Sequence, residues 1–320
     1  MAKYRNALPQ SQDRFFLTDG GIETTLIFLD GQDLLYFAAF HLLKTHSGQE
    51  SLRKYFRTYA ELARTHRSGV VLETATWRAS KDWGDKLGYT ADALAEANRK
   101  CVDILREIRD EYESNETPIV ISGCLGLRGD GYVPTDLMSE GQAEDYHRSQ
   151  VETFAGTPVD LVTAITMNYA AEAIGIARAA QKAALPVVIS VTVETDGRLP
   201  TGQSLGDAIK EIDEATSTYP SYFMINCAHP THFSGVVDGD EAWTSRIRGL
   251  RANASVMSHA ELNEAPDLDA GDPEALARDY AVLKRQELKY LNVFGGCCGT
   301  DHRHVHQMAL SCLPLFRSAP

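Results

Sequence analysis

Short apolar runs alternate with amphipathic stretches along the whole chain. Several runs are almost continuously apolar, as in 186–191, and such runs are typical of strands that are buried on both faces. The stretches between them repeat apolar residues at spacings of three and four, which indicates helices that bury one face. The expected strands are 15–19, 70–76, 118–123, 160–167, 186–193, 222–227, 254–259 and 291–294. The expected helices are 52–63, 94–108, 171–184, 207–215 and 273–290.

Strands that alternate with helices predict an α/β fold with parallel strands, and eight is the number of strands that closes a (β/α)8 TIM barrel. A doubly wound open sheet is the alternative, but the segment 19–23 after the first expected strand lacks the G-x-G-x-x-G pattern. Because no long linker interrupts the pattern, we expect residues 1–320 to form a single barrel domain. The irregular stretches 125–140, 194–203 and 228–240 each follow a strand, and in a barrel such loops lie at the catalytic end.

The chain is acidic and moderately hydrophobic. Hydrophobic residues make up 43% and charged residues 23% of the 320 residues, as in an ordinary globular protein. Lys and Arg number 31 against 44 Asp and Glu, and the resulting charge of −13 repels phosphate backbones. The apolar stretch 34–43 is too short to cross a bilayer, and residues 1–14 lack the apolar core of a signal peptide. We therefore expect a cytoplasmic protein with no nucleic-acid or membrane partner.

Two of the six cysteines, Cys297 and Cys298, adjoin each other within the segment 295–299, Gly-Gly-Cys-Cys-Gly. The glycines permit a sharp turn that lets both thiols face one metal ion, although a strained disulfide or simple packing are alternatives. Cys227 ends the sixth expected strand, and the ends of barrel strands open onto one face, so the three thiols can converge. Three protein ligands leave one tetrahedral position open, as in catalytic zinc sites, and thiolates favour Zn²⁺. Cys101 and Cys312 are expected to be packing or bystander thiols, and Cys124, which ends the third expected strand, is expected to line the site without binding metal.

Several motifs, in order, resemble those of the zinc-dependent homocysteine S-methyltransferase family over nearly the whole chain. They are 17–24, 73–80, 123–126, 146–148, 196–202, 226–227 and 295–301. The resemblance implies a (β/α)8 barrel in which Cys227, Cys297 and Cys298 bind zinc. It also implies that homocysteine binds this zinc as a thiolate and attacks a methyl group on a sulfonium, an ammonium or a methylfolate, giving methionine. The expected partners are homocysteine and a methyl donor, S-methylmethionine or S-adenosylmethionine.

Five residues are expected to shape the substrate pocket: Asp19, Gly20, Glu73, Thr166 and Asn226. Asp19 and Gly20 end the first strand, where the alternative is a turn or helix start. Glu73 interrupts an apolar run, so it serves either the site or a structural ion pair, since a buried acid needs a partner. Asn226 precedes a cysteine ligand and either orients it or satisfies loop backbone.

The fourth expected strand departs from the family pattern. The resemblance implies a Glu-Thr pair there, whose carboxylate holds the amino group of homocysteine, but this chain has Ile165 before Thr166. Either another acid substitutes, with Glu23, Glu73 and Glu194 as the candidates, or the acceptor is a different thiol. A non-catalytic zinc or thiol-binding barrel is a further alternative, whereas the thiolate-rich ligand set argues against a water-activating hydrolase.

Aromatic and histidine side chains near these motifs have two interpretations. The segment 77–78 (Trp-Arg) and Trp83 can stack on a methyl donor or simply pack. The histidines of 229–232 and 302–306 are expected to be solvated or to pack on helices, and to be ligands only if a thiol is missing.

Overall fold

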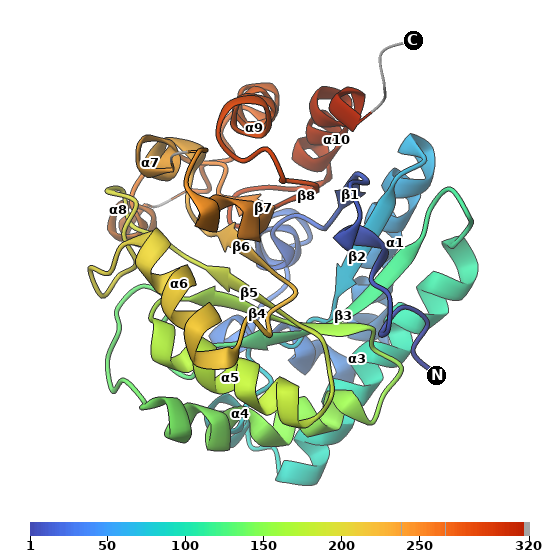
Figure 1. The fold of residues 1–320 in the computed structure, drawn as a ribbon. Helices are drawn as coiled ribbons and strands as arrows, with labels where there is room; N and C mark the ends of the chain where they lie inside the picture. The colour runs from blue at the N-terminus through green and yellow to red at the C-terminus, as the bar shows by residue number, and fades with distance from the viewer. Residues whose placement is uncertain (238, 266, 317–320) are drawn as a thin grey trace.

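Eight parallel strands close into a barrel, with helices arranged around the outside (Figure 1). The computed structural model describes residues 1–237, 239–265 and 267–316. Each strand pairs with the next one in the sequence, and β8 closes on β1, so the TIM barrel is confirmed and the open sheet is excluded. The strands are β1 (Phe16–Leu17), β2 (Gly69–Glu73), β3 (Ile119–Gly126), β4 (Leu161–Met167), β5 (Val187–Val191), β6 (Tyr222–Asn226), β7 (Ile247–Ala252) and β8 (Val293–Gly296).

Most crossovers between strands carry a long helix, whereas the described residues between β6 and β7 form only α7 and short 3₁₀ turns. The helices are α1 (His46–His66), α2 (Lys81–Lys86), α3 (Ala91–Tyr112), α4 (Glu140–Ala155), α5 (Ala170–Lys182), α6 (Leu205–Thr216), α7 (Pro230–Phe233), α8 (His259–Glu264), α9 (Pro273–Gln286) and α10 (His302–Cys312). The 3₁₀ turns are η1 (Pro9–Ser11), η3 (Leu35–Phe37), η4 (Ala39–Lys44), η5 (Ser234–Val236), η6 (Ala242–Arg246) and η7 (Leu313–Phe316), and η2 (Thr24–Leu29) is a π-helix. No helix in the described part of the chain is both long and apolar enough to cross a membrane.

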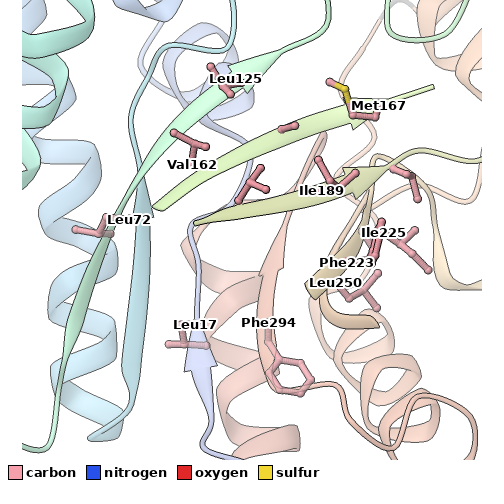
Figure 2. Close-up of a cluster of buried hydrophobic side chains, with 14 of the residues drawn as sticks. Leu17, Leu72, Leu125, Val162, Met167, Ile189, Phe223, Ile225, Leu250 and Phe294 are labelled. Carbon is pink, nitrogen blue, oxygen red and sulfur yellow. The ribbon is translucent and has the colours of Figure 1, made fainter. Parts of the chain in front are cut away.

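Successive residues of each strand serve two different cores, because side chains alternate between the faces of a strand. One set, which includes Leu17 and Phe294, belongs to the large cluster shared with helix residues such as Tyr59 (Figure 2). The alternate set, which includes Phe16 and Val71, forms a second, smaller cluster inside the barrel. Burial on both faces explains why the strands appear as nearly continuous apolar runs.

The alternating set changes character toward the carboxyl ends of the strands. Beyond the apolar cluster it becomes polar, with buried Glu73, Ser122, Ser190, Asn226 and Arg251. A buried polar group needs a partner, and these side chains find theirs in one another and in the loops at this end of the barrel, called the mouth below.

The seventh strand is Ile247–Ala252, so the prediction of a strand at 254–259 is wrong. The β7 segment looks polar because it contains Gly249 and two arginines. Gly249 is required by packing, since a Cβ there would lie 2.4 Å from Met224 Cγ, and Arg251 is neutralised by carboxylates inside the barrel. The apolar residues of 254–259 instead form the loop that leads into α8.

Helix α4 has no counterpart among the predicted helices. Its buried face includes Glu144, His147 and Gln150, so apolar spacing alone does not reveal it. His147 Nε2 lies 2.8 Å from Glu172 Oε1 on α5, and this polar contact takes the place of an apolar one.

Candidate metal and thiol centre

Three thiols converge at the mouth of the barrel. Cys227 follows β6, and Cys297 and Cys298 follow β8. Their Sγ atoms all lie within 4.8 Å of one another, and Cys227 Sγ is 4.0 Å from Cys298 Sγ. Among the described residues, no other group of three His, Cys, Asp or Glu side chains is arranged to hold a metal ion. Cys227 is buried and Cys298 is exposed, so the cluster is reachable from solvent.

The glycines before the two adjacent cysteines allow the chain to approach its neighbours closely. A Cβ on Gly295 would lie 1.8 Å from Thr18 Oγ1, and one on Gly296 would lie 2.1 Å from Thr300 Oγ1. After the cysteines, Asp301 caps α10 by accepting a hydrogen bond from Arg303 N at 2.8 Å. The cysteine loop is therefore held between a strand that touches β1 and a capped helix.

Asn253, which follows β7, joins the two cysteine segments. Its Nδ2 donates to the carbonyl of Cys227 at 3.0 Å, and its Oδ1 accepts from the amide of Cys298 at 3.1 Å. Asn253 is buried, so both bonds are shielded from water. Sequence reasoning missed this residue because the seventh strand was placed after it rather than before it.

Asn226 connects the thiol cluster to β4 and β5. Its Oδ1 accepts from Thr166 N at 3.0 Å and from Ser190 Oγ at 2.6 Å. Its Nδ2 donates to Thr166 Oγ1 at 2.8 Å and lies 4.0 Å from Cys297 Sγ. Thr166 has a φ of 67°, a left-handed conformation that is strained for a β-branched residue, and Asn226 holds both its amide and its hydroxyl.

Arg251 lies within the barrel beneath the cysteines and faces two acids. Its Nη2 is 2.6 Å from Asp19 Oδ1, and its Nη1 is paired with Glu73 Oε2. Burial raises the pKa of both carboxyls against the lowering effect of Arg251, and the two carboxylates raise the pKa of Arg251 although burial alone would lower it. The Gly20 carbonyl accepts from Arg251 Nη2 at 3.3 Å and from Tyr55 Oη at 2.9 Å. One cation therefore organises three of the five predicted pocket residues.

The thiols interact with each other and with two residues that the sequence did not single out. Hydrogen bonds from Cys297 and Cys298 hold the pKa of Cys227 well below its ordinary value, and the bonds of Cys298 with Cys227 and Cys297 raise the pKa of Cys298. His259 Nε2 donates to the Cys227 carbonyl, and its ring stacks on Tyr132 with centroids 3.9 Å apart. Burial, followed by the charge of Cys227, raises the pKa of Tyr132, so this phenol remains protonated beside the cluster.

Three acids had been predicted as substitutes at Ile165, and the structure separates them. Glu73 is paired with Arg251, and Glu194 Oε1 lies 3.4 Å from His259 Nδ1. Glu23 has no ion-pair partner among the described residues, and burial raises its pKa to about 7, with the charges of Cys227 and Asp19 adding to the rise.

The donor set fits a tetrahedral thiophilic ion. Zn–S bonds of about 2.3 Å place tetrahedral sulfurs about 3.8 Å apart, close to the observed separation of 4.0 Å between Cys227 and Cys298. Two of the histidines that were considered as substitute ligands have other partners: His229 caps α7, and His304 Nε2 donates to the Ala270 carbonyl at 2.8 Å. The three thiols can therefore hold a metal ion and leave a fourth position for another ligand.

A sequence model of the family described as homocysteine S-methyltransferase matches residues 16–312. The chain belongs to this family. The match extends from β1 to the end of α10 and so includes every strand and all three thiols.

Curated relatives of this S-methyltransferase family member share about a quarter of its residues. Betaine–homocysteine S-methyltransferase 1 of Rattus norvegicus is 23% identical over 265 residues, which are 76% of this chain and 61% of the rat protein. Methionine synthase of Mycobacterium tuberculosis is 26% identical over 83% of this chain, but the match covers only 21% of the synthase. Selenocysteine Se-methyltransferase of Brassica oleracea var. italica is 22% identical over 78% of each chain. The chain thus spans about three fifths of the rat protein and about a fifth of the synthase.

Solved structures share the barrel. The oxidized form of the homocysteine methyltransferase MmuM from Escherichia coli superimposes with a TM-score of 0.74 at 19% identity, covering 95% of this chain and 98% of that one. Its metallated form gives a TM-score of 0.71 at 17% identity, with the same coverage. At these identities the likeness establishes the fold.

Proposed function

We propose that this chain is a zinc-dependent S-methyltransferase that transfers a methyl group to the thiolate of homocysteine, giving methionine. The observation that carries the proposal is the convergence of Cys227, Cys297 and Cys298 at the solvent-accessible mouth of a barrel of this family. The activities for which the rat and Escherichia coli relatives are named support the same reaction class.

Zinc is the metal that the ligand set favours. Three thiolates from two strand ends form a soft, tetrahedral donor set, and soft sulfur ligands select Zn²⁺ over the oxygen-loving divalent ions. When bound, zinc lowers the pKa of a coordinated thiol, so that the sulfur is a thiolate nucleophile near neutral pH.

The residues of the chain hold and shield the reacting sulfur. Asn253 fixes the backbone of Cys227 relative to Cys298, and Asn226 keeps Cys297 beside the end of β4. The substrate thiol gives its proton to solvent, its sulfur forms a bond to the methyl carbon, and the bond from that carbon to the donor's sulfonium breaks, releasing a neutral thioether. Such an in-line displacement needs alignment more than acid–base chemistry, which suits a rigid, hydrogen-bonded mouth.

We place the substrate pocket around Asp19, Gly20, Glu73, Thr166 and Asn226. Each lies at the end of a strand in the layer that surrounds the cysteines. Asp19 and Glu73 act through Arg251, which carries a positive charge to the underside of the cluster and acts on Cys297. A positive charge there offsets the negative charge of three thiolates.

The proposal also includes the methyl donor, the domain organisation and a cytoplasmic location of the protein. We infer a sulfonium donor, S-methylmethionine or S-adenosylmethionine, and one barrel domain over residues 1–320. All six cysteines are free, which suits the reducing cytoplasm.

A different thiol acceptor is the second candidate, and Ile165 favours it. The side chain is only 8% exposed at the end of β4, where it offers an apolar surface to the mouth. An isoleucine cannot pair with the ammonium group of homocysteine, so recognition of that group needs another acid.

Product analysis tests the proposal. Zinc-loaded, reduced protein receives homocysteine with S-methylmethionine, S-adenosylmethionine, betaine and methyltetrahydrofolate, and mass spectrometry identifies the products. We expect methionine from the wild type and from Cys101→Ala, which alters a buried thiol on α3. We expect Cys297→Ser to lose more than the roughly 100-fold that an outer-shell change causes. Equal turnover by Cys297→Ser would contradict the proposal.

A further inference from the structure

Arg78 is a buried cation that forms no salt bridge with any residue the structure describes. It follows β2, is 8% exposed, and its guanidinium lies 4.0 Å from the ring of Trp77 and 3.9 Å from that of Trp83. Nη1 donates to the Gly129 carbonyl at 3.0 Å, whereas buried Nε has no hydrogen-bond partner. Burial lowers the pKa of Arg78 to about 10, so the group stays charged at neutral pH. Buried arginines are normally paired, and this planar guanidinium, which contacts two aromatic rings, still has an N–H group without a partner.

Glu23 is an unpaired acid at the cysteine loop. It lies directly before η2, in a segment that is attached to this loop on both sides. The Gly21 amide donates to the Thr300 carbonyl at 3.1 Å, and Thr24 Oγ1 accepts from the Gly299 amide at 3.0 Å. The Glu23 side chain is partly exposed and forms no salt bridge among the described residues. It is therefore available to a cation that enters the mouth.

The two charges act on each other and on the cluster without touching. The carboxylates of Asp130 and then Glu23 raise the pKa of Arg78 against the effect of burial, and the charge of Cys227 adds to the burial that raises the pKa of Glu23. The Gly129 carbonyl that receives Arg78 precedes Tyr132, beside the thiols, by three residues, a span of at most about 11 Å. The thiol cluster, a cation that can bind an anionic group (Arg78) and an acid that can bind a cationic group (Glu23) thus lie at the same mouth.

Ile165 lies against the same group of side chains. The indole Nε1 of Trp77 donates to the Ile165 carbonyl at 3.2 Å, so the stack of Trp77 and Arg78 stands next to the end of β4. Because β4 contributes an apolar side chain here, any charge recognition at this place must come from other elements. The other two acids are engaged, Glu73 by Arg251 and Glu194 by His259.

We propose that Glu23 binds the α-ammonium group and Arg78 the α-carboxylate of the thiol acceptor, so that this pair selects an amino-acid thiol. The proposal rests on the proposed function, since it assumes that the acceptor sulfur is bound at Cys227, Cys297 and Cys298. It accounts for both unpaired charges, because a zwitterion supplies the missing partner of each. It also reconciles Ile165 with homocysteine as the acceptor.

Three thiols separate the two recognition events. Homocysteine carries both charged groups, 4-mercaptobutanoate lacks the ammonium group, and 3-aminopropane-1-thiol lacks the carboxylate. We expect Glu23→Gln to raise the KM of homocysteine and of the aminothiol about 10- to 100-fold, and to leave 4-mercaptobutanoate unchanged. We expect Arg78→Met to raise the KM of homocysteine and of 4-mercaptobutanoate by a similar factor, and to leave the aminothiol unchanged.

Two variants guard against a structural explanation. Arg78→Lys keeps the charge and is expected to recover part of the carboxylate selectivity that Arg78→Met loses, although a lysine cannot reproduce the contacts of a planar guanidinium with the two indole rings. Glu194→Gln removes another partly exposed acid that was considered as a substitute at Ile165. This variant is expected to leave the ratio of the KM values of the three thiols unchanged. Metal content and unfolding midpoint are measured for every variant.

The outcomes that overturn the proposal are specific. An equal loss with all three thiols would show a structural role for the altered residue. A higher KM for the methyl donor alone would assign the Arg78 carboxylate site to the donor. If the wild type turns over none of the thiols, the proposed function fails. Calorimetric binding of the three thiols to the zinc-loaded protein then tests the proposal separately, and equal Kd values for them would overturn it.

Discussion

The two ends of the barrel each bury an arginine among carboxylates, and the two clusters are built differently. At the amino-terminal end, Arg109 Nη1 donates to Asp160 Oδ2 at 2.8 Å. Asp160 also accepts from the amides of Lys3, Tyr4 and Ile121 at 2.9, 2.7 and 2.9 Å. One cation thus meets one carboxylate whose oxygens are fully satisfied by the backbone.

At the mouth, one cation meets two carboxylates, and the three cysteines lie above them. Arg251 faces Asp19 and Glu73, and burial raises the pKa of both acids. The charges at this end do not cancel, so the stability of the cluster depends on the position of the single Arg251 guanidinium. The comparison teaches that the same residue types can serve different purposes. At the amino-terminal end their charges are paired and stabilise the fold, whereas at the mouth their charges are not balanced and can act on a ligand.

Two buried asparagines repeat the contrast. At the amino-terminal end, Asn292 Nδ2 donates to the carbonyls of Gln10, Gln12 and Arg14, each at 2.9 Å, and so fastens the N-terminal segment under the barrel. At the mouth, Asn253 joins Cys227 to Cys298. One amide secures the fold, whereas the other secures the distance between two cysteines of the cluster.

The largest expected effect is on stability, in a comparison of the two arginines. Arg251→Met leaves two buried carboxylates without a cation, and we expect a loss of about 3–5 kcal/mol in the free energy of unfolding. Arg109→Met leaves Asp160 with three backbone donors, and we expect a loss of about 2 kcal/mol. Urea unfolding of the metal-free, reduced proteins measures both. A larger loss for Arg109→Met would contradict the contrast between the two ends.

The two asparagines are expected to differ in metal affinity. Asn253→Ala removes the link between two ligand segments, and we expect a 10- to 100-fold weaker affinity for zinc. Asn292→Ala is expected to leave zinc affinity unchanged while it lowers stability by about 1–3 kcal/mol, because three carbonyls lose a buried donor. Competition with a chromophoric chelator measures zinc affinity. An equal loss of zinc affinity in both variants would contradict the different roles given to the two asparagines.

The smallest effect concerns the helix cap behind the cysteine loop. Burial alone would raise the pKa of Asp301, but hydrogen bonds from His304 and Arg303 hold it well below its ordinary value. Its stabilising contribution is therefore present above the unfolded-state pKa of about 3.9 and is lost as the pH falls below it. We expect Asp301→Asn, which still caps α10, to lose about 1 kcal/mol at pH 7.

Unfolding at pH 7, 5, 4 and 3 tests this expectation. The difference between the wild type and Asp301→Asn should shrink from pH 5 to pH 3, because the Asp301 carboxyl of the unfolded chain becomes protonated while that of the folded protein stays ionised. A difference that stays constant over this range would assign the effect to the geometry of the cap rather than to its charge.

The thiol cluster was predictable because its residues mark the ends of strands. Cys227 and the pair of Cys297 and Cys298 each end an apolar run, and closure of a barrel brings such ends together. Seven of the eight strands were located by the same apolar signal. The family resemblance added the expectation that these three thiols bind a metal ion, which stays a prediction.

The supporting residues were not predictable, for physical reasons. Arg251 resembles an exposed residue until its partner Glu73, 178 positions away in the chain, is brought beside it. Asn253 was hidden by the misplaced seventh strand, whose polar appearance comes from Gly249 and its arginines. Tyr132 and His259 meet only through the folding of two loops, which leaves no periodic signal.

Zinc K-edge X-ray absorption tests the central claim most directly, because it counts the sulfur atoms around the metal. For the zinc-loaded, reduced protein we predict three sulfurs and one lighter atom, as three cysteine ligands and one open position require. Addition of homocysteine should convert this to four sulfurs at about 2.3 Å. Fewer than three sulfurs in the resting protein, or no change on addition of homocysteine, would contradict the account.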